Sequence, residues 1–432
     1  MSPELVGVLG IVLLLVLFAL RMQVGMSMLI VGFLGFAYLS NTSASLTLLG
    51  MVPYATAGAY GLSVIPLFIL MGMFLSYGGL GKDIFESANT WVRHVKGGMA
   101  MATIAAIAVW SAISGSATAT AASLGSVVLP EMKRHKYNDA LATACVAAGG
   151  TMDILIPPSS VLVLYGLLTE ESIGKLLIAG ILPGLLLAAL FAVVILIWVK
   201  RDPTAAPVQP PAPYRERIRS LKPIWAVIVI FLLVMGGIYQ GFFTPTEAAA
   251  VGAFVSLIVS LGSKRFSRDA MIGAMASAAS TTAMLFLILI GAIILSRFLA
   301  VTLIPYKLSA YIAGLNVSRY VIIGIIGMVL IILGCFIEGL SLMVLTVPIL
   351  YPLIIDLGFD GIWFGVWLVT LLNIGMVTPP VGINVYVTAG VARGVPLMTI
   401  FKGVTPFWIS MVAAAILLVA FPEIATWLVS FM

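Results

Sequence analysis

The stretch that decides the fold is Asp153-Ile154-Leu155-Ile156-Pro157-Pro158-Ser159-Ser160, together with its later counterpart Gly375-Met376-Val377-Thr378-Pro379-Pro380-Val381-Gly382. Each stretch breaks a long apolar run, at 138–168 and at 361–392. Two consecutive prolines remove two backbone N–H donors and prevent a helix from continuing. Broken backbone at membrane depth is stable only where protein encloses it or where it lines a water-filled cavity. The two stretches therefore predict broken membrane helices around a binding site.

The composition predicts a chain embedded in a lipid bilayer. Of its 432 residues, 62% are hydrophobic and only 9% are charged, whereas a soluble domain carries about 25% charged residues. The N-terminus lacks a basic region and a cleavage site, so we expect a retained first membrane helix. Two runs interrupted by small or polar residues, 97–130 and 318–355, are expected to be re-entrant hairpins. Spans able to cross about 30 Å of hydrocarbon are expected at 5–20, 24–40, 61–80, 173–199, 223–240, 246–263, 271–300 and 397–420.

The basic residues set the expected orientation. If residue 21 is cytoplasmic and both interrupted runs are hairpins, all but four of the 22 Lys and Arg residues fall in cytoplasmic loops, Arg21 and Lys264 among them. This bias is the positive-inside pattern of membrane proteins. It places both termini on the periplasmic side, but it does not separate a re-entrant hairpin from one that crosses fully. The four exceptions are Lys175, Arg297, Lys307 and Arg319.

The two halves of the chain form a predicted inverted repeat. An offset of about 222 residues places Pro157-Pro158 on Pro379-Pro380, and Pro130 on Pro352. Each half holds three spans, a hairpin, a broken helix and a further span, and this odd number of crossings inverts the second half. Inverted repeats with paired broken helices are typical of secondary transporters. We therefore predict an all-α polytopic membrane protein with a first repeat at 1–200, a cytoplasmic linker at 201–222 and a second repeat at 223–432.

Polar residues beside the broken stretches are the candidate ligands. Freed carbonyls and hydroxyls suit a monovalent cation, and the new helix N-termini suit an anionic substrate group. The first hairpin tip, Ser114-Gly115-Ser116-Ala117-Thr118-Ala119-Thr120, is rich in hydroxyls, and close packing through small residues is the alternative interpretation. The candidate substrate-binding residues are Ser159, Ser160, Glu338 and Asn384.

Asp153 and Glu338 are the acidic residues placed deepest in the apolar runs, where a carboxyl group is a functional candidate by default. For Asp153, four roles stay open: cation ligand, proton carrier, partner of a basic residue, or structural hydrogen-bonded carboxyl. Arg297 is either a counter-ion for the substrate or a snorkelling side chain near a span end, and we favour the second interpretation.

Other kinds of chemistry lack support in the sequence. No Walker A, HExxH or GxSxG motif occurs, which argues against an ATP-driven pump and against common membrane hydrolases. Cys145 and Cys335 lie in apolar segments and predict neither a disulfide framework nor a metal site. The net charge of +6 comes from short loop clusters and not from a nucleic-acid-binding motif. We expect no catalytic residue, no cofactor and no nucleic-acid partner.

The chain resembles the large membrane subunit (M, DctM-type) of the tripartite ATP-independent periplasmic (TRAP) transporters over nearly its whole length. Each matching motif is weak alone, but together the motifs are specific. They are Ser114-Gly115-Ser116-Ala117-Thr118-Ala119, Ile156-Pro157-Pro158-Ser159, Thr244-Pro245-Thr246-Glu247-Ala248-Ala249-Ala250-Val251-Gly252 and Gly375-Met376-Val377-Thr378-Pro379-Pro380-Val381-Gly382.

This resemblance implies a sodium-coupled importer of carboxylates, sialic acids or sulfonates in a bacterial or archaeal inner membrane. It implies an elevator mechanism, in which a transport domain holding both hairpins slides against a fixed scaffold. It also implies two protein partners, a small four-helix membrane subunit (Q) and a soluble periplasmic substrate-binding protein (P). Sodium ions are the implied coupling ions.

The resemblance further implies two sodium sites, built mostly from main-chain carbonyls, each between a hairpin tip and a Pro-Pro loop. Asp153 departs from the family pattern, in which many members are expected to have glycine, and this leaves a changed substrate or ion preference open. The residues of this chain at the positions of the first site are Ser114, Ser116, Asp153, Ile156 and Pro158, and those at the positions of the second are Gly339, Gly375, Thr378 and Pro380.

Three alternatives remain at this stage. A sodium/organic-anion symporter that works without a binding protein would have the same repeats. An anion channel would not need two matched cation sites, and its flux would not depend on a sodium gradient. An intramembrane enzyme would need a nucleophile and a base, and the sequence offers no such pair.

Overall fold

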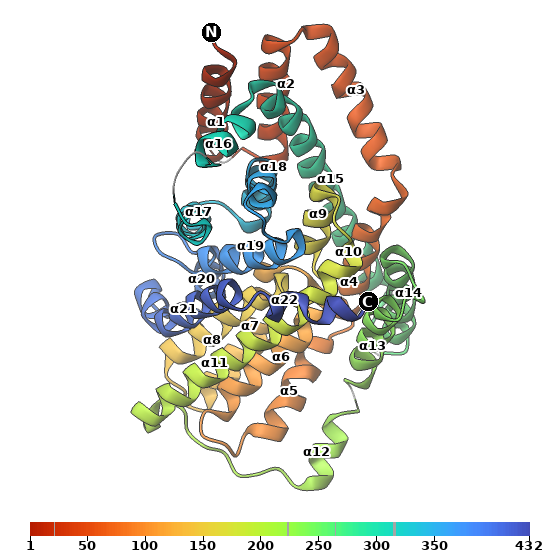
Figure 1. The fold of residues 1–432 in the computed structure, drawn as a ribbon. Coiled ribbons are helices and arrows are strands. Elements are labelled where there is room, and N and C mark those ends of the chain that lie inside the picture. The colour runs from red at the N-terminus through yellow and green to blue at the C-terminus, as the bar shows by residue number, and fades with distance from the viewer. Residues whose placement is uncertain (21, 223, 264, 314–316) are drawn as a thin grey trace.

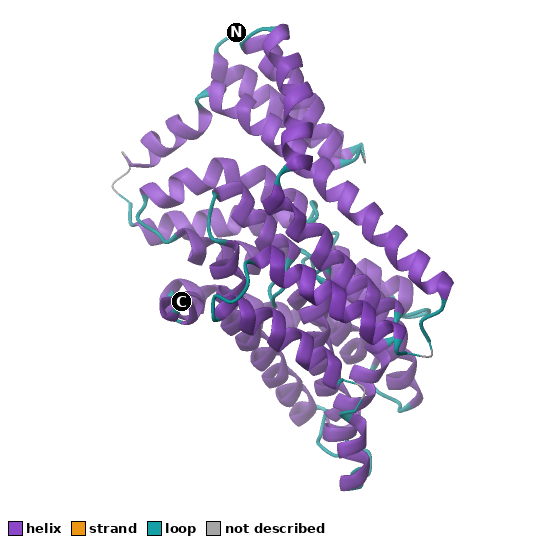
Figure 2. Cartoon of the chain, turned by 90° about the vertical axis from the view of Figure 1, so that its right-hand side faces the viewer, coloured by secondary structure: helices purple, strands orange, loops and turns teal. Residues whose placement is uncertain are grey.

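The computed structural model is built from helices throughout the residues that it describes, which are 1–20, 22–222, 224–263, 265–313 and 317–432. Figures 1 and 2 show long helices joined by short loops, with no strand in this part of the chain. The predicted all-α polytopic fold is therefore confirmed. By length and apolar composition, five of the described helical segments, or six if one bent pair is counted, are able to cross a membrane: Tyr60–Tyr77, Ile173–Arg201, Arg268–Thr302, Gly339–Asp356 and Leu397–Ala420, with Tyr214–Ser220 plus Trp225–Tyr239 as the pair.

One group of helices packs around the 35-residue helix α15 (Arg268–Thr302). Glycines on α2 (Val24–Leu39) allow close contact with α15, because a Cβ atom at Gly25 would lie 2.6 Å from the backbone of Leu287, and one at Gly32 would lie 2.7 Å from that of Leu295. Small residues permit such close approach between membrane helices. The helices of this group that contact α15 directly are α1 (Pro3–Ala19), α2, α3 (Thr42–Gly58), α4 (Val64–Tyr77) and α16 (Ile304–Ala313). The group is completed by α14 (Pro245–Leu261), which packs on α4, and by α13 (Trp225–Tyr239), which packs on α14.

Two helical hairpins lie against this group. In the first, α6 (Gly98–Ser114) and α7 (Ala117–Arg134) are joined at Gly115, whose φ of 68° is a left-handed conformation that glycine adopts at little cost. In the second, α17 (Arg319–Gly334) and α18 (Gly339–Asp356) are joined by four residues. Each of the two runs expected to form a hairpin, 97–130 and 318–355, contains two helices joined by a short connection.

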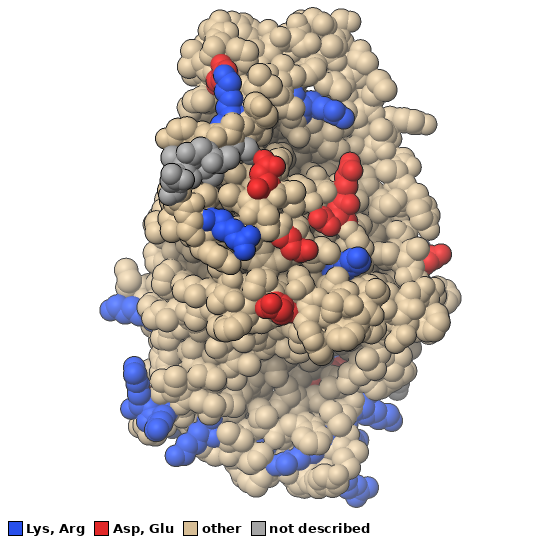
Figure 3. Space-filling model, in the orientation of Figure 1, with Lys and Arg blue, Asp and Glu red and all other residues tan. Residues whose placement is uncertain are grey.

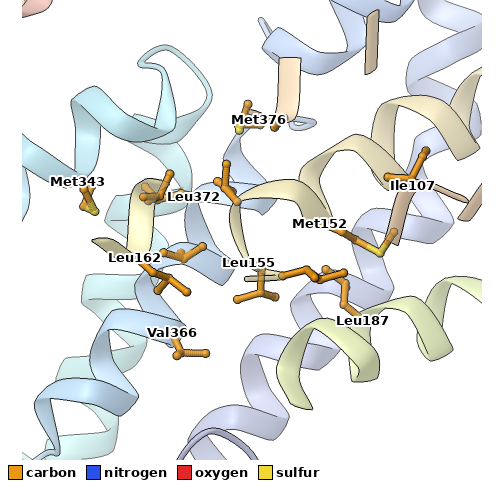
Figure 4. Packing of buried hydrophobic residues seen from close by; sticks show 14 of the residues in the cluster. Ile107, Met152, Leu155, Leu162, Leu187, Met343, Val366, Leu372 and Met376 are labelled. Carbon is orange, nitrogen blue, oxygen red and sulfur yellow. The ribbon is translucent and has the colours of Figure 1, made fainter. Parts of the chain in front are cut away.

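The two broken helices form the centre of the molecule. The first consists of α8 (Asp139–Thr151), a short 3-10 turn (Met152–Ile154) and α9 (Ser160–Thr169), and the second of α19 (Gly361–Gly375) and α20 (Ile383–Val391). Both Pro-Pro peptide bonds are cis. Every residue of α19 is buried, and a helix that is apolar all round belongs in a core. Figure 4 shows this core, where Met152 and Leu155 of the first break belong to the same buried cluster as Leu372 of α19 and Met376 of the second break.

The remaining helices confirm one expected span and add two helices that the sequence did not predict. The span expected at 173–199 is a 29-residue helical segment able to cross a membrane, Ile173–Arg201, in which Gly180 separates α10 (Ile173–Ala179) from α11 (Ile181–Arg201). The helix α3 was missed because hydroxyl and amide residues at 41–45 lower the hydropathy of its start, where Asn41 caps the helix. The amphipathic helix α5 (Leu80–Val92) was also missed. The chain closes with α21 (Leu397–Ala420), α22 (Glu423–Thr426) and a 3-10 turn (Leu428–Phe431).

The linker at 201–222 is not a free loop. It contains α12 (Tyr214–Ser220) and is tied to the end of α5, since the Arg93 side chain donates to the Pro210 carbonyl at 3.0 Å and pairs with Glu216 at 3.2 Å. In Figure 3 the end of the molecule that carries α12 displays mainly Lys and Arg, while acidic groups gather nearer the middle. This distribution agrees with the expected cytoplasmic side. Arg21 and Lys264 lie outside the described residues, and the orientation and repeat boundaries stay predictions.

Candidate functional site

A cavity of about 190 Å³ lies where both hairpin tips and the first Pro-Pro loop meet α4 and α15. The first tip contributes residues 113–119, the first loop contributes Ile154, Pro158, Ser160 and Val161, and the second tip contributes residues 338–340. The opposite wall comes from α4 and from Thr281, Met284 and Leu285 of α15. Elements far apart in the sequence therefore line one cavity.

A buried chain of hydrogen bonds supports the first tip. The hydroxyl of Thr120 lies 3.0 Å from the Ser114 hydroxyl and 2.9 Å from Oδ1 of Asp153. A hydroxyl has one proton to donate, so if Thr120 donates to the carboxylate, Ser114 must donate to Thr120. The oxygen lone pairs of Ser114 are then left for a ligand. Sequence reasoning did not assign Thr120 a role, because a hydroxyl within an alanine-rich helix looks the same as a packing residue.

Asp153 is fully buried, and its second carboxylate oxygen, Oδ2, has no hydrogen-bond partner among the described residues. Leaving a buried carboxylate oxygen unpaired is costly. A bound cation beside this oxygen would remove that cost. The role as partner of a basic residue has no support, because the ion pairs of the described residues do not include Asp153.

The first loop is anchored to the tip. The Ser160 hydroxyl donates to the Gly115 carbonyl at 2.8 Å, across 45 residues of sequence. The Ser159 hydroxyl donates instead to the Ile154 carbonyl at 2.6 Å and accepts from the Leu162 N–H, so it caps α9 and lies outside the cavity. Of the two serines expected to bind substrate, the structure places only Ser160 at the cavity.

Of the other residues predicted for the first sodium site, some line the cavity and one does not. Ser116 and Pro158 line the cavity, but the side chain of Ile156 faces a separate groove between α6, α11 and α13. Asn384 is also outside the cavity: it is fully buried, and its Nδ2 donates to the Ala147 carbonyl at 3.3 Å. Arg297 is exposed and lines no part of the cavity, which agrees with the snorkelling interpretation.

The residues predicted for the second cation site are less buried than those of the first. Gly339 lines the cavity, whereas Pro379 and Pro380 are exposed. The Thr378 hydroxyl donates to the Ile374 carbonyl at 2.5 Å and accepts from Nε1 of Trp408 at 2.8 Å. A hydroxyl oxygen with both bonds keeps one lone pair for a ligand. The contribution of Trp408 carried no signal in the sequence, since it lies within the long apolar run of α21.

Gly375 lies where the second broken helix meets the second hairpin. A Cβ atom there would be 2.6 Å from Cα and 2.7 Å from C of Gly334. The equivalent position in the first half is Asp153, whose side chain has room beside Thr120. The two predicted cation sites therefore differ in charge. The described residues hold no cluster of three or more His, Cys, Asp or Glu suited to a metal such as zinc.

The fold is similar to that of a solved membrane protein. It is similar to the Alcanivorax borkumensis YdaH transporter, with a TM-score of 0.65, 15% sequence identity, and coverage of 88% of this chain and 89% of the other. At this identity the likeness shows the fold alone.

The sequence comparisons define the family. The family model "Tripartite ATP-independent periplasmic transporter, DctM component" matches residues 11–424. The chain is 35% identical over 374 residues to the C4-dicarboxylate TRAP transporter large permease protein DctM of Pseudomonas aeruginosa, covering 86% of this chain and 87% of that protein. It is 33% identical over 408 residues to the sialic acid TRAP transporter large permease protein SiaM of Vibrio cholerae, covering 93% of each. The chain belongs to the DctM family of TRAP transporter large permeases.

Proposed function

We propose that this chain is the large permease subunit of a sodium-coupled importer of small organic carboxylates in a bacterial or archaeal inner membrane. The observation that carries the proposal is the cavity itself, because both hairpin tips and the first Pro-Pro loop meet there against α4 and α15. A cavity of about 150 Å³ holds benzene, so a cavity of about 190 Å³ favours a compact solute over a nine-carbon sugar acid.

Sodium is the proposed coupling ion at both tips. At the first, Asp153, Ser114 and Thr120 offer a carboxylate and hydroxyl oxygens in a buried setting. At the second, Gly339, Gly375 and Thr378 offer main-chain oxygens and one hydroxyl. These oxygen donors suit a hard cation, and neutralising Asp153 by sodium would lower the cost of its burial.

Transport would proceed by an elevator movement. In this proposal α4, α15 and their neighbours are the scaffold, and the hairpins with the broken helices move against them. The cavity lies on the boundary between the two groups, which is where such a movement would carry a solute from one side to the other. The tripartite family description supports two partners, a small membrane subunit and a periplasmic binding protein, and this favours a binding-protein-dependent importer over an independent symporter.

Sodium binding is testable on the purified full chain. Replacing potassium by sodium should raise its thermal unfolding temperature, because a ligand that binds only the folded state stabilises it. Thr378→Val removes one ligand oxygen while keeping the side-chain shape, so the sodium-dependent rise should shrink.

Thr378→Ser, which keeps the hydroxyl, is the matched control and should retain the rise. The difference between the two salts is the quantity to compare, because Thr378→Val also leaves the Trp408 N–H unpaired and lowers stability in both. An equal sodium effect in Thr378→Val and the original chain would remove Thr378 from the site.

A further inference from the structure

In the described part of the chain, the lining of the cavity contains an acidic side chain and no basic one. Glu338 is the one charged side chain among the described residues that line it, and Lys, Arg and His are all missing from that lining. An anion entering this space would meet a carboxylate and no basic side chain. Like charges that approach in a partly buried site repel strongly.

Glu338 is itself poorly satisfied. Among the described residues, its side chain has one hydrogen bond, a long one from the Ser341 hydroxyl to Oε2 at 3.4 Å. It forms no ion pair within the described chain, and it does not cap α18 although it occupies the N-cap position. An ionised carboxylate accepts several hydrogen bonds, so Glu338 keeps acceptor sites that face the cavity.

The net charge of the site with two sodium ions bound also disfavours an anionic solute. This argument rests on the proposed function. Two sodium ions bring two positive charges, while Asp153 and Glu338 bring two negative ones. The sum is zero, so no positive charge remains to hold an anion. With glycine at position 153, the same site would keep one positive charge for a carboxylate.

The N-terminus of α7 also lines the cavity and offers donors. The helix α7 begins at Ala117, and its N-cap residue Ser116 makes no side-chain cap hydrogen bond. The first N–H groups of a helix lack an intrahelical partner and carry the positive end of the helix dipole. Because residues 117–119 line the cavity, these groups of α7 lie beside it. A carboxylate is a natural ligand for such an end.

We propose that the solute is a zwitterion, a compact carboxylate that also carries a cationic nitrogen. Its carboxylate binds at the N-terminus of α7 beside Ser114 and Ser116, and its cationic group binds at Glu338. Glu338 is then the residue that selects for the positive charge, and Asp153 keeps the loaded site neutral.

The test uses pairs of solutes that differ only in charge. Glycine betaine is paired with tert-butylacetate, and γ-butyrobetaine with its isostere in which a quaternary carbon replaces the nitrogen. Succinate serves as the dianion. The full chain, reconstituted in nanodiscs with saturating sodium, is titrated with each solute, and binding is read from thermal stabilisation.

The proposal expects at least one zwitterion to bind tenfold or more tightly than its isostere and than succinate, a preference equal to about 1.4 kcal/mol. Glu338→Gln should abolish that preference, and Glu338→Asp should keep it. Tighter binding of succinate or of the isosteres, or no binding of any zwitterion, would overturn the proposal even if both variants failed to fold. Sodium-dependent binding of succinate would leave the proposed sodium-coupled function intact, whereas sodium-independent binding of every solute would count against that function.

Discussion

Gly375→Ala is expected to abolish transport and to lower the thermal unfolding temperature of the chain. The added methyl group would lie 2.6 to 2.9 Å from three backbone atoms of Gly334, which ends the first arm of the second hairpin. Backbone atoms cannot rotate away as a flexible side chain does, so the hairpin and the broken helix must separate. Overpacking of this kind costs about 1–3 kcal/mol, and occasionally more.

Gly324→Ala is the matched control for this substitution. Gly324 lies on the same arm, α17, and a Cβ atom there would have no neighbour within 4 Å in the described part of the chain. It should leave uptake and unfolding temperature unchanged. If Gly375→Ala transports at the original rate with an unchanged unfolding temperature, the close approach of these two elements is not needed for function.

Asp153→Asn is expected to raise the sodium concentration for half-maximal transport by more than tenfold. The substitution keeps the volume and an oxygen that accepts from Thr120, but it removes the negative charge. Two opposite charges about 5 Å apart, at an effective dielectric constant of about 20, attract by about 3 kcal/mol. Even half of that energy corresponds to a tenfold change in affinity.

Sodium titration of uptake, with the unfolding temperature measured in parallel, checks this expectation. Asp139→Asn provides the control, because Asp139 is an exposed carboxylate at the start of α8, the helix that leads into the turn containing Asp153. An Asp153→Asn protein with the original sodium dependence would exclude the carboxylate from the cation site and leave it a structural role.

The sequence was sufficient to locate the breaks that organise the fold. Paired prolines cannot continue a helix, so they mark a break in each half of the chain. The two interrupted apolar runs, one in each half, predicted the hairpins. The sequence was less informative about α3 and α5, since a polar start or an amphipathic face resembles a loop when only apolar runs are counted. The division at Gly180 was hidden because the residues on both sides are equally apolar.

The candidate site was predicted only in part for a related reason. Ser114, Ser160 and Glu338 lie at the breaks, where sequence reasoning placed them, and they do line the cavity. Ser159 and Asn384 lie at the breaks as well, yet local geometry turns one into a helix cap and the other toward α8. The α15 wall, with Thr281 and Met284, comes from a helix whose sequence shows only an apolar span.

The central claim, sodium-driven transport through the cavity between the hairpin tips, is tested most directly by uptake into proteoliposomes. The chain is reconstituted with its membrane subunit and supplied with the loaded binding protein, under an inward sodium gradient or an equal potassium gradient. The account predicts accumulation of solute above the external concentration with sodium alone, and loss of accumulation when the gradient is collapsed. Solute flux that only equilibrates, at the same rate in both salts, would contradict the account and indicate a channel.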